Sequence, residues 1–80
     1  MAKWRDIKTV KVVNSKGETL TIKLGHKYVH GSAGVLTITK IEMECYMWKR
    51  IYGITNLGMK YVIEQFNTPE FRANFLFEVE

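Results

Sequence analysis

The sequence contains one cysteine and one proline, and no tract of low complexity. A single cysteine, Cys45, cannot form an internal disulfide, which excludes a disulfide scaffold and suits a reducing compartment. The first residues lack the apolar core of a signal peptide, and no apolar run approaches the ~18 residues of a membrane span. We therefore expect a cytoplasmic protein with no membrane partner.

Motifs for catalysis and for metal binding are also missing. The sequence shows no paired-carboxylate pattern, no Cys-x-x-Cys pair, and no Gly-Lys-Ser/Thr after the glycine-rich segment 31–34. Zinc binding by His26, His30 and Cys45, or a nucleophilic pairing of Cys45 with a histidine, is chemically possible, but nothing in the spacing selects either. The sequence predicts neither an enzyme nor a cofactor.

Negative charge is scarce in most of the chain. Residues 1–60 carry eleven Lys or Arg and four Asp or Glu, whereas residues 61–80 carry one Arg and four Glu. The net charges are +7 and −3, which sum to the +4 of the whole chain. A basic body with an acidic end favours an anionic partner, although a few excess charges are also ordinary for a small domain.

Alanine occurs only three times, whereas Val, Ile and Thr occur seven times each. Side chains branched at Cβ fit a pleated sheet better than a helix. We expect one all-β domain over residues 1–80, a small antiparallel barrel or strongly bent sheet of five or six strands. The expected strands are 7–13, 18–24, 35–43, 46–55, 60–66 and 75–80, with a short extended piece at 27–30.

Residue types at the breaks predict how these strands are joined. Segments 14–17 and 56–59 predict tight turns and therefore two hairpins. Thr68 as an N-cap and Pro69 at a first helical position predict one short helical turn over residues 69–74. Strict alternation from residue 75 would direct Phe75, Phe77 and Val79 inward in a closing strand, although this acidic, aromatic end is also compatible with a partner-binding segment.

A glycine, a loop, a second glycine and then a strand occur in residues 25–31 and 34–41. This segment resembles part of the SH3-like small-barrel class, which implies an SH3-like fold. Barrels of that class bind protein, RNA and DNA partners, so the resemblance leaves the partner open. In overall character the chain is also similar to short accessory proteins of bacteriophages.

One expected strand carries aromatic and cationic side chains at a spacing of two. In an unbroken strand Tyr46, Trp48, Arg50 and Tyr52 share one face, as rings and cations do on sheets that hold single-stranded nucleic acid. The alternative is that Trp48 and Tyr52 point inward and Lys49 outward. A bulge near Cys45 or Gly53 would also break this register.

Lys49 on the same strand is a further candidate contact for nucleic acid or for a partner. The N-terminal half supplies more cations, of which Lys8, Lys11, Lys23 and Lys27 are the candidate phosphate contacts. Lysines on strands also serve to protect sheet edges, which is the alternative explanation. The first hypothesis is a non-enzymatic module that binds nucleic acid, single strands in particular, through a basic and aromatic sheet face. The second is a protein-interaction module, such as a phage-type inhibitor or accessory subunit that binds a host protein or a nucleic-acid-handling complex. Neither hypothesis fixes the oligomeric state.

Overall fold

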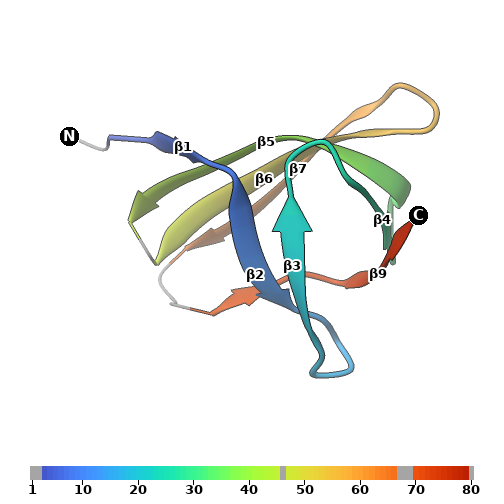
Figure 1. The fold of residues 1–80 in the computed structure, drawn as a ribbon, viewed down its shortest axis with the longest axis horizontal. Helices are drawn as coiled ribbons and strands as arrows, with labels where there is room; N and C mark the ends of the chain where they lie inside the picture. Colours follow the sequence, from blue (N-terminus) through green and yellow to red (C-terminus); the bar gives the residue numbers. More distant parts are fainter. Residues whose placement is uncertain (1–2, 46, 67–69, 80) are drawn as a thin grey trace.

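The computed structural model describes residues 3–45, 47–66 and 70–79, which form two β-sheets and no helix (Figure 1). The larger sheet has the strand order β7-β6-β5-β4-β9, with β1 paired to β5, and the smaller sheet has the order β3-β2-β8. The strands are β1 (Arg5–Ile7), β2 (Thr9–Val13), β3 (Thr19–Lys23), β4 (Lys27–His30), β5 (Gly34–Cys45), β6 (Trp48–Thr55), β7 (Lys60–Phe66), β8 (Phe71–Arg72) and β9 (Phe75–Val79).

Both expected hairpins are present. β2 pairs with β3, and β6 pairs with β7 over the whole length of β7. In the first turn Gly17 has a φ of 80°, a conformation that favours glycine, as the turn prediction requires. Asn14 is buried there: its Oδ1 accepts the N–H groups of Lys16 and Glu18, and its Nδ2 donates to the carbonyl of Phe75. One side chain therefore shapes the turn and attaches it to β9.

β5 is the longest strand and carries the bend of the large sheet. It pairs with β6 along its length, with β4 near one end, and with β1 towards the other. Its register with β6 shifts between Ile38 and Lys40 and again between Met43 and Cys45. Bulges of this kind bend a strand and increase its twist, so the two register shifts account for the bend of the large sheet.

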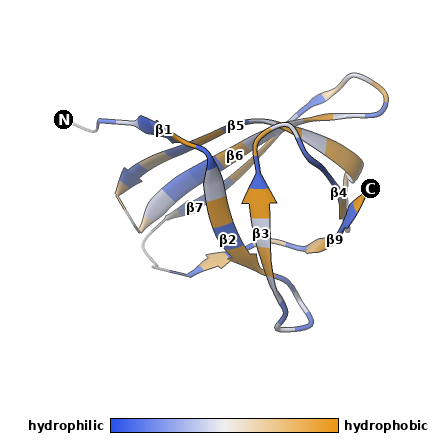
Figure 2. Ribbon diagram, in the orientation of Figure 1, coloured by the Kyte–Doolittle hydropathy of each residue, from blue (hydrophilic) through white to orange (hydrophobic). Residues whose placement is uncertain are grey.

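The two sheets pack face to face around one apolar core, and β2 and β3 lie over the β5–β6–β7 part of the large sheet (Figure 1). Hydrophobic and hydrophilic residues alternate along β2, with Val10 and Val12 buried and Lys11 exposed (Figure 2). The buried apolar residues come from both sheets: Val10, Val12, Ile22, Tyr28, Leu36, Ile38, Ile41, Ile51, Phe71 and Phe75.

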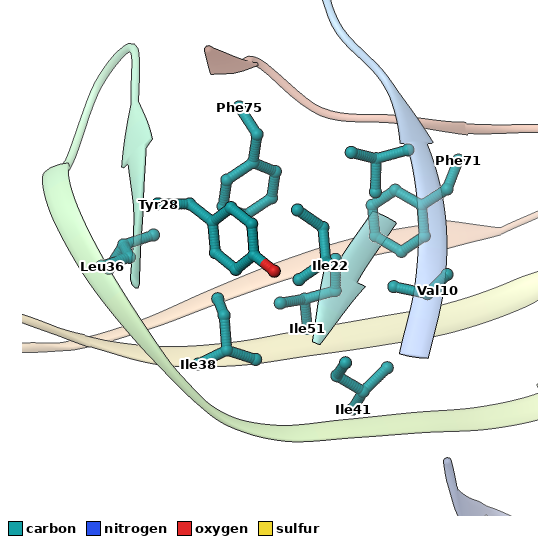
Figure 3. Packing of buried hydrophobic residues seen from close by; sticks show 10 residues of the cluster. Val10, Ile22, Tyr28, Leu36, Ile38, Ile41, Ile51, Phe71 and Phe75 are labelled. Atoms are coloured by element: carbon teal, nitrogen blue, oxygen red, sulfur yellow. The ribbon is translucent and has the colours of Figure 1, made fainter. Parts of the chain in front are cut away.

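Tyr28 links the two layers. It is fully buried on β4, and its hydroxyl points across the core towards Ile22 of β3 (Figure 3). The hydroxyl accepts the N–H of Lys23 at 2.9 Å and donates to the carbonyl of Thr21 at 3.1 Å. A large-sheet side chain thus satisfies the backbone at the end of β3. Burial raises the pKa of Tyr28, so the group stays neutral.

The helical turn predicted for residues 69–74 is wrong where the structure describes it. Pro69 lies outside the described residues, and Phe71 and Arg72 form β8, which runs parallel to β2. Phe71 is only 2% exposed. Its burial beside Val12 outweighs the local capping signal, because burying a phenylalanine side chain contributes about 1.5–3 kcal/mol.

The expected inward alternation after residue 75 is also wrong. Phe75 is buried, but Phe77 is 57% exposed. Phe75 pairs with His30 and Phe77 with Val29, so the register shift leaves Leu76 without a paired residue. That bulge moves Phe77 to the outer side. The all-β class is confirmed, but neither sheet closes into a barrel through the strand pairings of the described residues.

We predict that Tyr28→Phe lowers the free energy of unfolding by about 1–2 kcal/mol, because it removes two partly buried hydrogen bonds, to the N–H of Lys23 and the carbonyl of Thr21. Urea unfolding measures the change. Tyr61→Phe is the matched control, since the Tyr61 hydroxyl has no hydrogen bond within the described chain, and its effect should stay within about 0.5 kcal/mol. Equal effects of the two variants would contradict the role assigned to the Tyr28 hydroxyl.

Candidate nucleic-acid interface

The structure places three of the four predicted aromatic-face residues together. Trp48, Arg50 and Tyr52 lie half-buried on the outer face of β6, whereas the intervening Ile51 is buried in the core. The register shift near Cys45 falls in β5, so the alternation along β6 survives. Tyr46 lies outside the described residues. Lys49 is half-buried on the other side of β6, where burial lowers its pKa.

Arg50 is the centre of this face. Its Nε donates to Oε2 of Glu64 at 2.8 Å, and its Cζ lies 3.9 Å from the centre of the Trp4 ring. Trp48 Nε1 donates to the same Oε2 at 2.8 Å, and the Trp4 and Trp48 rings meet edge to face at 5.4 Å. The guanidinium therefore joins the N-terminal segment to β6 and β7.

A second carboxylate lies on the other side of Arg50. Glu42 is only 6% exposed, accepts the hydroxyl hydrogen of Tyr52, and lies 3.4 Å from both Arg50 and Lys40. The Tyr52 hydrogen bond, with the charges of Lys40 and Arg50, holds the pKa of Glu42 below its ordinary value against the effect of burial. The same hydrogen bond raises the pKa of Tyr52.

The pKa of Glu64, on the other neighbouring strand, is also lowered. Hydrogen bonds from Trp48 and Arg50 lower its pKa, and the bond to Glu64 raises the pKa of Arg50. We call this group the Arg50 cluster: Trp4, Glu42, Trp48, Arg50, Tyr52 and Glu64. Trp4, Glu42 and Glu64 are not among the predicted site residues, although Glu42 and Glu64 lie directly across from Arg50 on the two neighbouring strands.

The Arg50 cluster is not a positive surface. Glu42, Glu64 and Asp6 provide three negative charges around it, against two positive charges from Arg50 and Lys40. The guanidinium already has two carboxylate partners, and the indole N–H of Trp48 is also engaged. A phosphate would have to displace these contacts to reach Arg50.

Two of the predicted lysines, Lys11 and Lys23, lie elsewhere, on the outer side of the small sheet. Pairing of Thr9 with Lys23 and of Lys11 with Thr21 places Lys11 and Lys23 diagonally across β2 and β3. Residues 8–24 contain four lysines and one glutamate, a net charge of +3. Lys8, directly before β2, and Lys16, in the turn between β2 and β3, are also exposed, and we call these four lysines the lysine face: Lys8, Lys11, Lys16 and Lys23. None of them forms an ion pair within the described chain.

Lys27, the remaining predicted lysine, lies on β4 across from Thr37 and Val79 of the large sheet. Because the two sheets pack face to face, the outer side of β2–β3 and the outer side of β6 lie on opposite sides of the core. The lysines of the small sheet and the Arg50 cluster are therefore two separate surfaces and not one composite face.

The two histidines of the sequence have different environments. His26 Nδ1 contacts Glu78 at 2.8 Å, whereas His30 is buried and its Nδ1 accepts the N–H groups of Ser32 and Ala33. Burial lowers the pKa of His30. Among the described residues, no three His, Cys, Asp or Glu side chains lie close enough to hold a metal ion.

The described chain has no helix that is long and apolar enough to cross a membrane. Comparisons with protein-family models, with curated proteins and with solved structures found no match. The assignment of a function therefore rests on the two surfaces themselves.

We predict that Glu42→Gln removes a pH-dependent part of the stability. The folded-state pKa of Glu42 lies below its ordinary 4.5, so its stabilisation is present above that value and is lost as pH falls through the folded-state pKa. At neutral pH the variant should lose about 1–2 kcal/mol of unfolding free energy, and the gap should narrow in acid. Urea unfolding from about pH 7 to about pH 3 measures it.

Glu44→Gln is the control, because Glu44 has no ion pair or hydrogen bond within the described chain. A gap between wild type and Glu42→Gln that stays constant with pH would contradict the electrostatic explanation.

Proposed function

We propose that this protein is a non-enzymatic binding module that contacts the phosphate backbone of nucleic acid through the lysine face. The observation that supports the proposal most directly is the concentration of net charge. A net +3 of the chain's +4 lies in residues 8–24, on lysines that no carboxylate of the described chain neutralises. Neutralising phosphates with such lysines releases counterions and drives sequence-independent binding.

The neighbouring side chains suit this role. Thr9, Thr19 and Thr21 are exposed on the same two strands as Lys11 and Lys23. Threonine hydroxyls donate hydrogen bonds to phosphate oxygens and position a backbone without reading its bases. The proposed contact therefore carries no sequence preference.

The Arg50 cluster supports base stacking less well. Its two indole rings contact each other, the Trp4 ring also contacts Arg50, and the Trp48 N–H is bound to Glu64. The predicted preference for single strands rests on Tyr46, Trp48, Arg50 and Tyr52. Of these, Trp48, Arg50 and Tyr52 lie across the core from the lysine face. In the form proposed here, the protein binds single and double strands through the same phosphate contacts.

We also propose an SH3-like fold and a cytoplasmic location. The SH3-like resemblance rests on residues 25–41, which form β4, its turn and the first part of β5. A cytoplasmic location rests on the single Cys45, which is exposed as a free thiol.

A second candidate function is binding to a host protein, as a phage-type inhibitor or accessory subunit would do. The observation in its favour is the β6–β7 hairpin, which projects from the body of the molecule (Figure 1). Leu57 and Met59 at its end are 87% and 64% exposed. Beside them lies a depression of about 460 Å³ that reaches Ala33 and Val35. Apolar anchors of this kind are typical of protein interfaces.

We predict that the double variant Lys11→Glu with Lys23→Glu weakens binding to a short oligonucleotide at least about tenfold and lowers the salt slope by about two. Fluorescence anisotropy with labelled single and double strands, at about 50 and 200 mM salt, measures both. The control is Lys3→Glu with Lys60→Glu, which makes the same change in net charge on two exposed lysines outside residues 8–24.

Equal losses in the two double variants would contradict a localised site and leave only a net-charge effect. No binding by the wild-type protein at about 50 mM salt would contradict the proposed function and favour the second candidate.

A further inference from the structure

β7 is an edge strand of the large sheet. Its seven residues pair with β6 without any register shift, and its other side has no strand partner within the described chain. Edge strands are ordinarily kept apart by short length, bulges or outward charges. β1 and β8 are short, β9 contains a bulge, and β3 presents threonines and a lysine. β7 is seven residues long, has neither a bulge nor a proline, and carries two exposed charges of opposite sign, Lys60 and Glu64, which repel a second copy less than charges of one sign would.

Apolar side chains are exposed along this edge. Val62 is 52% exposed in the middle of β7, and Ile54 on the adjoining part of β6 is 37% exposed. Tyr52 is the cross-strand neighbour of Val62 on the same outer face. The free edge is therefore bordered by an apolar strip, which a lone copy of the chain leaves in contact with water.

We propose that two copies of this chain associate through their β7 strands, antiparallel and centred on Val62. In such a dimer the core-facing residues of one copy must pair with the core-facing residues of the other, so that both cores lie on the same side of the joined sheet. Because side chains alternate along a strand, this happens only when the two-fold axis passes through one residue, which then pairs with its own copy in the partner. Centring on Tyr61 would place Lys60 across from Val62, and centring on Ile63 would place Val62 across from Glu64. Only centring on Val62 places Lys60 across from Glu64.

The charges select the same register. Lys60 of each copy lies across from the partner's Glu64, so the two-fold axis produces two opposite-charge pairs. Lys60 has no ion pair within the described chain. Both hydrogen bonds to Glu64 use Oε2, which leaves its Oε1 available.

The side chains of the opposite face also match. With Val62 at the axis, Tyr61 lies across from the partner's Ile63. Tyr61 and Ile63 are half-buried and already pack against the core of their own copy. Pairing would extend both cores across the axis and join the two large sheets into one, with Val62 beside the partner's Val62 on the outer face.

The test is sedimentation equilibrium of the full chain up to about 1 mM, with Lys60→Glu as the disrupting variant. That change places carboxylates across from each other at both pairs and should raise the dimer Kd about tenfold or more. Lys27→Glu is the control: it makes the same change in charge on an exposed lysine of β4, away from the edge, and should leave Kd unchanged.

Mixing Lys60→Glu protein with Glu64→Lys protein tests the register itself. Each variant repels its own copies, but the mixture restores both opposite-charge pairs, so a mixed dimer should form with a Kd within about threefold of wild type. Circular dichroism checks the fold of Glu64→Lys, which also loses its bonds to Arg50 and Trp48. If that variant does not fold, the comparison of Lys60→Glu with Lys27→Glu decides alone.

A wild-type chain that remains monomeric at about 1 mM would overturn the proposal. Equal dimer Kd values for Lys60→Glu and Lys27→Glu would also overturn it, because the association would then use another surface.

Discussion

Tyr28 spans the core from β4 to β3, and its hydroxyl satisfies two backbone groups of the small sheet. An 80-residue chain buries a modest core, so one buried polar link between layers has a large influence on how the layers sit. Together with the apolar residues around it, Tyr28 holds β2–β3 face to face with the large sheet. This packing decides whether an outward-facing side chain lies on the outer side of the small sheet or on the outer side of the large sheet.

That assignment separates two groups of residues that the sequence suggests as one surface. Lys11 and Lys23 on β2 and β3 point away from the core and form no ion pair within the described chain. On the far side, carboxylates from β5 and β7 neutralise Arg50 and engage Trp48. The first surface keeps its charge available for a partner, whereas the second uses its charge to attach the N-terminal segment through Trp4. The distinction follows from cross-strand neighbours and not from composition.

Much of the fold was predictable, because local rules govern it. Alternation along β2 and the glycine turn at Gly17 are visible in the sequence, and so is the β6–β7 hairpin. The site was less predictable. The predicted turn at 56–59 limits which residues of 60–66 can lie across from Arg50, so the contact with Glu64 could have been predicted. The contacts with Glu42 and Trp4 depend on pairings with β5, which the sequence does not indicate. The bulge at Leu76 and the strand at Phe71 depend on core packing, which overrides the local signals of alternation and of Pro69.

The central claim is that the lysine face, and not the Arg50 cluster, meets nucleic acid. An amide-resolved NMR titration of the full chain with a short oligonucleotide tests it most directly. The structure predicts that shift changes concentrate in residues 8–24 and diminish as salt is raised. Changes that concentrate instead at Trp48, Arg50 and Tyr52 would contradict the claim and restore the aromatic face as the binding surface.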